Sequence, residues 1–242
     1  MKFNYVLSLV VLLFVGSSAS AQVWLDIAPK VGYGLSGFYN NNVWSDTEHN
    51  NQFNSGYAYG GKIGVNIGEY NGFIIEGLLQ HGRQEFQHRV GTDRIPNRTE
   101  WQSLDLSLMY RFNSQGSYLE IGPQMSLLQS VDQTYDGLPL ETSNFFGDNY
   151  FGAAAGFGGF IAGNEFFTLV MGIRIGYAFT DMMGPQAQDA SNPPPAPYIT
   201  YDSYSSSHPF YAQVQMEFSF GIGGAARAAC GRRNYMFGSR YR

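Results

Sequence analysis

Cysteine, charge and long apolar runs are all scarce in this chain of 242 residues. It has a single cysteine, Cys230, which excludes a disulfide within the chain, the usual covalent support of a secreted domain. Charged residues make up 14%, against about 25% in ordinary soluble domains. After the N-terminal segment, no run is long and apolar enough to predict a transmembrane helix. Stability must therefore come from the pairing of strands.

The first 21 residues predict a cleaved secretory signal peptide. Lys2 precedes an apolar run over residues 5–15, and the small residues that follow end in Ala19-Ser20-Ala21. The run is well short of the roughly 20 apolar residues that a spanning helix needs. We expect cleavage before Gln22.

Aromatic residues, at 16%, and glycines, at 30, are abundant. The segment SLDLSLMYRF, residues 103–112, alternates strictly, with Leu106 and Leu108 on one face and Asp105 and Arg111 on the other. A soluble strand would bury the leucines, whereas a strand of a small membrane barrel would turn them to lipid and enclose the charges. The spacing of similar runs decides between the two.

Eight alternating runs are predicted, at residues 23–38, 55–67, 72–84, 99–112, 117–130, 150–162, 166–180 and 209–220. Short turns GEYNG, NSQG and GNE alternate with long polar connections at 39–54, 85–98, 131–149 and 181–208. This rhythm predicts an all-β fold, an eight-stranded antiparallel up-and-down transmembrane β-barrel over residues 22–221. It would have short periplasmic turns, four long extracellular loops and both termini in the periplasm of a Gram-negative bacterium.

Aromatic residues near the ends of the runs predict two interfacial girdles. The inner girdle would hold Trp24, Phe73, Phe112, Phe167 and Phe218, and the outer one Tyr33, Tyr57, Trp101, Tyr177 and Phe210.

The face opposite the apolar one predicts a charged barrel interior, or lumen. Eight strands leave an interior that side chains fill, so charges there must pair. Four basic and five acidic residues are candidates for a lumen ion network: Asp26, Lys30, Lys62, Glu76, Asp105, Arg111, Glu120, Arg174 and Glu217. Small residues of the sixth run would make room for long neighbours. A filled lumen predicts no wide pore.

Catalytic and metal motifs are weak. Four histidines, His49, His81, His88 and His208, lie in or near the long connections, and we find no His–Ser pair with the spacing of a barrel deacylase. His81 and His88, with Glu85 and Asp93, leave open a lipid- or peptide-modifying site at the mouth. We predict no enzyme, cofactor or metal. Calcium in the acidic third connection stays an alternative without a supporting motif.

The charge changes sign at the C-terminal end. Residues 22–224 hold 8 basic and 19 acidic residues, whereas residues 222–242 form a tail with five arginines and no acid. We predict that this periplasmic tail contacts a partner protein or anionic headgroups. The predicted contact residues are Arg227, Arg232, Arg233, Tyr235, Phe237, Arg240, Tyr241 and Arg242.

With the signal, the eight runs and the opening QVWLDIAPKVGYGLSG, residues 22–221 resemble the small PorT-like outer-membrane β-barrel proteins of Bacteroidota. The resemblance implies an accessory barrel of an envelope machine, with type IX secretion among the possibilities. The basic tail departs from it, because the common barrel ends at an aromatic residue comparable to Phe220. We expect a non-enzymatic subunit that contacts lipid and an outer-membrane or periplasmic protein, and no nucleic acid. The alternative is an adhesion or protection barrel that acts through its extracellular loops.

Overall fold

The computed structural model describes residues 23–52, 54–164, 166–189, 196, 198–199 and 201–223. The expected signal peptide lies outside these ranges. Cys230 and the eight predicted contact residues of the tail also lie outside these ranges. Of the predicted tail, residues 222–242, the structure describes residues 222–223.

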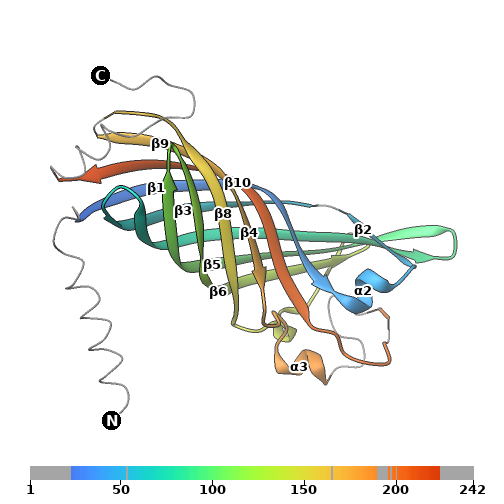
Figure 1. Ribbon diagram of the computed structural model, residues 1–242. Helices are drawn as coiled ribbons and strands as arrows, with labels where there is room; N and C mark the ends of the chain where they lie inside the picture. The colour runs from blue at the N-terminus through green and yellow to red at the C-terminus, as the bar shows by residue number, and fades with distance from the viewer. Residues whose placement is uncertain are drawn as a thin grey trace, which may run out of the picture.

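Eight long strands form a closed antiparallel ring in the described part of the chain (Figure 1). They are β1 (Val23–Asn40), β3 (Asn54–Ile67), β4 (Asn71–Val90), β5 (Asp93–Ser114), β6 (Ser117–Tyr135), β8 (Asn149–Gly163), β9 (Phe167–Ala178) and β10 (Ser207–Ile222). Each pairs with the next long strand in the chain, and β10 pairs with β1 from Leu25↔Ile222 to Asn40↔Ser207. The predicted eight-stranded up-and-down barrel is confirmed.

The barrel has a turn end and a loop end. At the turn end lie the start of β1, the end of β10 and the three tight turns (Figure 1). The turn between β5 and β6 has positive φ at Gln115 (45°) and Gly116 (90°), as the tight turns of β-hairpins require. The other four connections meet at the loop end.

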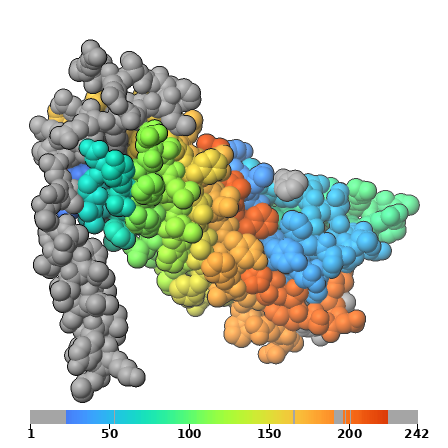
Figure 2. All heavy atoms as spheres, viewed as in Figure 1, coloured from blue at the N-terminus to red at the C-terminus, as the bar shows by residue number. Residues whose placement is uncertain are grey.

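The loop-end connections contain more regular structure than the sequence pattern indicated. β4 and β5 continue through the predicted loop 85–98 as a projecting hairpin, with register pairs such as His88↔Ile95 (Figure 1). Both faces of this hairpin carry polar residues, so its sequence lacks the alternation of apolar and polar residues that predicts a strand. The connections also hold α2 (Asn41–Ser45), β2 (His49–Gln52), β7 (Leu138–Leu140), η1 (Ser143–Phe145) and α3 (Pro185–Gln188). Figure 2 shows the hairpin tip standing clear of its neighbours on that face.

The outer face of the barrel is apolar and the inner face is polar. Leu106 and Leu108 are 44% and 54% exposed, whereas Asp105 and Arg111 on the same strand are each 4% exposed. Exposed isoleucine, leucine, valine and aromatic side chains cover the strands around the ring. A soluble monomer rarely exposes so large an apolar surface. The chain is a transmembrane β-barrel whose leucines face hydrocarbon. None of its described helices is long and apolar enough to cross a membrane.

The girdle prediction is wrong for two residues, Trp24 and Trp101. Both side chains point into the lumen and are 4% and 3% exposed. Their position in the alternation explains this, since each shares the face of its strand's lumen carboxylate. Trp101 lies over Gly82, where a Cβ atom would come within 2.2 Å of the indole. Other girdle residues, such as Tyr33 and Phe73, are exposed on the outer face.

Candidate functional site

The lower lumen, towards the turn end, holds a continuous network of buried ion pairs. Eight of the nine predicted lumen residues belong to it, and they come from every barrel strand except β8. The network consists of Asp26, Lys30, Lys62, Glu76, Arg111, Glu120, Arg174 and Glu217. Its four basic and four acidic side chains balance, which offsets the cost of burying them.

Arg111 is the bridge between the two sides of the network. Its guanidinium donates to Glu120 Oε2 from Nε (2.9 Å) and Nη2 (2.6 Å), and to Glu217 from Nη1 (2.9 Å) and Nη2 (2.8 Å). Its Cζ also lies 4.3 Å from the ring centroid of Tyr118. The planar guanidinium suits this forked contact, which a lysine ammonium would not reproduce.

The remaining pairs extend the network to both sides. Lys62 Nζ lies 3.0 Å from Asp26 and 2.5 Å from Glu217, whereas Lys30 Nζ lies 2.7 Å from Glu76. Arg174 bonds both Glu76 and Glu120. The lower lumen is therefore filled by side chains.

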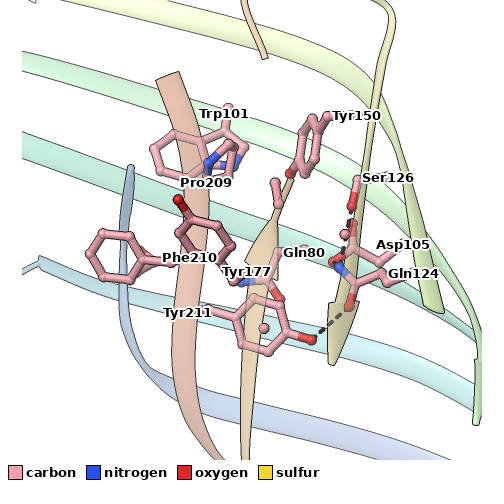
Figure 3. A pocket seen from close by; sticks show the side chains of 14 residues that line it. Gln80, Trp101, Asp105, Gln124, Ser126, Tyr150, Tyr177, Pro209, Phe210 and Tyr211 are labelled. Carbon is pink, nitrogen blue, oxygen red and sulfur yellow. Dashed lines mark hydrogen bonds between the residues drawn. The ribbon is translucent and has the colours of Figure 1, made fainter. Parts of the chain in front are cut away.

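Asp105 lies apart from the network. Its carboxylate accepts hydrogen bonds from Ser103 Oγ and Gln124 Nε2, both at 2.8 Å, and it forms no ion pair with a described residue. It borders a cavity of about 20 Å³, room for one water molecule, which Gln80, Trp101 and Tyr211 also line (Figure 3). Figure 3 shows the Tyr211 hydroxyl directed at Gln124 Oε1, 2.7 Å away.

Glycines of β8 and β9 make room for the long lumen side chains, as predicted for the sixth run. A Cβ atom on Gly172 would lie 2.2 Å from Tyr118 Oη, and one on Gly156 would lie 3.0 Å from Glu120 Oε1. Larger residues at these positions would displace the network.

An apolar cap closes the loop end, which the sequence pattern did not reveal. It is formed by buried residues of the strand ends and connections: Phe38, Val43, Phe86, Trp101, Phe146, Tyr150, Ala178, Met182, Met183, Ala187 and Ala196. The cavity of about 20 Å³ lies between the ion network and the cap, and Trp101 and Tyr150 of the cap line it. Within the described residues, the ion network packs the lower lumen and the cap packs its mouth.

Hydrogen bonds and rings pin the fourth connection to the mouth of the barrel. The Tyr198 hydroxyl lies 3.2 Å from His49 Nε2 and accepts from Asn97 Nδ2 at 3.2 Å. Its ring lies 4.7 Å from that of His88. Burial lowers the pKa of His49, and the nearby carboxylate of Asp46 partly opposes this. The neutral form of the His49 imidazole is thus favoured where it meets Tyr198.

Tyr198→Phe is expected to loosen the fourth connection while keeping the ring contacts. The change removes the hydroxyl that bonds both His49 and Asn97, at a local cost of about 1–3 kcal/mol. Limited proteolysis of the folded protein should cut this connection faster. Tyr39→Phe is the control, because its exposed hydroxyl bonds only Asn41 Oδ1, and equal cleavage of both variants would contradict the pinning.

A serine and a histidine of matching spacing do occur, so the sequence-based statement that none exists is wrong. Ser206 lies two residues before His208, and Ser206 Oγ is 2.7 Å from His208 Nε2. His81 instead stacks on Tyr57, at a centroid distance of 4.9 Å. The described residues contain no group of three or more His, Cys, Asp or Glu that could hold a metal ion.

No family model and no curated protein matches the chain. Among solved structures it is similar to the outer membrane protein OprG from Pseudomonas aeruginosa, with 10% identity over 84% of this chain and 97% of that chain and a TM-score of 0.45. Neisserial surface protein A has 10% identity, coverages of 82% and 97% and a TM-score of 0.43. The attachment invasion locus protein Ail of Yersinia pestis, solved with a heparin analogue, has 14% identity, coverages of 81% and 99% and a TM-score of 0.40. Because these identities and TM-scores are low, the evidence for the fold is the strand pairing of this chain itself.

Proposed function

We propose that the chain is an integral barrel of a bacterial outer membrane and serves as a structural or accessory subunit of an outer-membrane protein complex. The observation that carries this proposal is the closed lumen. Buried ion pairs fill its lower part and the apolar cap fills its mouth, so transport through the barrel is unsupported. What remains for function is the surface of the barrel, its connections and its tail.

The projecting β4–β5 hairpin supports a role in contacts. Its tip, residues 89–94, is exposed throughout and stands beyond the apolar belt. In the proposed orientation the hairpin is extracellular, and the three short turns and both termini are periplasmic. The arginine-rich tail then supplies the periplasmic contact, consistent with an envelope machine such as type IX secretion.

Truncation after Gly224 is expected to remove the partners that co-purify with the full chain from native outer membranes. The expected cause is the loss of five arginines from the periplasmic side. Mass spectrometry of the purified complexes measures the result. Heat-modifiable migration on gels is the control for general damage to the barrel, because it reports whether the truncated chain is folded. The proposal is contradicted if the truncated and full chains retain the same proteins, or if the full chain purifies alone.

The second candidate is an adhesion or protection barrel. The observation that favours it is that the four connections fold together into one cap rather than spreading as separate loops. An adhesin should keep its surface binding after truncation at Gly224 and lose it when the hairpin tip is deleted. The same two variants therefore separate the two functions.

A further inference from the structure

Ser206 and His208 form a hydrogen-bonded pair on the outer face of the barrel at the loop end. Both side chains are half-buried, and Ser206 Oγ lies 2.7 Å from His208 Nε2. His208 pairs in register with Tyr39, an outward residue of β1, and its ring stacks on outward Tyr177 at 5.9 Å and 20°. The pair therefore lies at the outer aromatic girdle, where lipid meets water.

A third group orients the histidine. His208 Nδ1 lies 3.1 Å from the carbonyl oxygen of Ala178, which can only accept, so Nδ1 carries the proton and donates it there. This leaves Nε2 as the acceptor for the Ser206 hydroxyl. A nucleophile within reach of a base, with the base held by a third group, is the arrangement of an activated serine. Here a backbone carbonyl takes the place of the usual carboxylate.

The lipid-facing surface has an apolar hollow that reaches two neighbours of His208, Tyr177 and Phe210. Its volume is about 420 Å³, and Tyr177 and Phe210 line it together with small residues such as Ala153 and Ala212. Tyr177 carries the stacked His208 ring, and Phe210 is two residues further along the same face of β10. The hollow faces hydrocarbon and its lining is almost wholly apolar. Its natural occupant is an acyl chain of a membrane lipid.

We propose that Ser206 and His208 hydrolyse the acyl ester of a membrane lipid whose chain lies in the hollow below them. Ser206 Oγ attacks the ester carbonyl carbon while its proton passes to His208 Nε2. The C–O bond to the lipid alcohol then breaks, and the alcohol leaves with that proton. Water, deprotonated by His208, cleaves the acyl-serine to release the fatty acid and restore the hydroxyl.

This activity goes beyond the proposed role as a complex subunit, and the experiment below tests it against the sequence-based expectation of a non-enzymatic chain. The proposed hydrolysis and the proposed subunit role can each fail without the other. A Ser206→Ala chain should keep its co-purifying partners, whereas truncation after Gly224 should leave hydrolysis unchanged.

The test uses the full chain, folded in detergent micelles, with a fluorophosphonate probe and p-nitrophenyl esters of short and long acyl chains. We expect the wild-type chain to be labelled on Ser206 and to hydrolyse the esters. Ser206→Ala should abolish labelling, and His208→Phe, which keeps a ring beside Tyr177, should lower kcat/KM by about 100-fold or more. Ser203→Ala is the matched control, because this serine is exposed in the same connection.

A second variant tests the hollow apart from the chemistry. Ala153→Phe should raise KM for the long-chain ester and leave the rate with the short-chain ester unchanged. Heat-modifiable migration on gels reports that each variant is folded. The proposal is overturned if the folded wild-type chain is neither labelled nor active, or if Ser206→Ala reacts like the wild type. Equal effects of Ala153→Phe on both esters would overturn the acyl-chain assignment.

Discussion

Arg111→Met is expected to destabilise the folded barrel by about 3–5 kcal/mol, the cost of breaking a buried ion pair from one side. The change leaves Glu217 with Lys62 as its remaining partner and Glu120 with Lys30 and Arg174. Four carboxylates of the ion network would then face three cations. Urea unfolding in detergent micelles, followed by tryptophan fluorescence, measures the loss.

The double variant Arg111→Met, Glu217→Gln should recover much of this stability, because three acids and three bases remain in the network. Arg83→Met is the control for a lost arginine. Its ion pair with Glu85, at 2.6 Å, is half-exposed on the outer face, so its loss should cost no more than about 1 kcal/mol. If the Arg111 and Arg83 variants unfold alike, the network does not stabilise the barrel. A double variant no more stable than Arg111→Met would show that charge balance is not what matters.

The barrel could be predicted from sequence because its two signals are long-range and regular. A period of two persists over eight runs, and connection lengths alternate between them. The same period places Asp26, Lys62 and Glu217 on one face, and in a cylinder of eight strands only one interior exists for them to meet in. Which acid pairs with which base depends on strand stagger, which the pattern does not contain.

The apolar cap could not be predicted from the sequence, because its residues share no hydrophobic periodicity. Phe38 lies near the end of β1, Val43 lies in a five-residue helix, and Met182 lies in a long polar connection. Only the closed ring brings these segments together. Trp24 could have been placed correctly from its parity with Asp26, because residues two apart in a strand share a face. The Ser206–His208 pair was visible as spacing alone, but its orienting carbonyl comes from β9.

Leu106→Arg is expected to destabilise the membrane-inserted barrel by about 2–4 kcal/mol, the cost of an arginine near the middle of the hydrocarbon. Leu106 pairs with Gly77 and Met125, between the aromatic residues at the two ends of these strands. Its side chain is 44% exposed, so arginine fits without steric conflict and the penalty comes from the surrounding lipid. Folding yield and urea unfolding in phospholipid vesicles measure it.

Val90→Arg is the matched control, because Val90 is just as exposed, at 48%, but lies at the tip of the β4–β5 hairpin beyond the apolar belt. Water surrounds an arginine there, so stability should change by no more than about 0.5 kcal/mol. Because Leu106 and Val90 are about equally exposed, a difference in stability between the two variants reports whether the side chain faces lipid or water. Equal effects of the two changes would mean that the leucine face does not meet hydrocarbon. The lumen charges would then be the core of a soluble protein, and the acyl-chain hollow would lose its ligand.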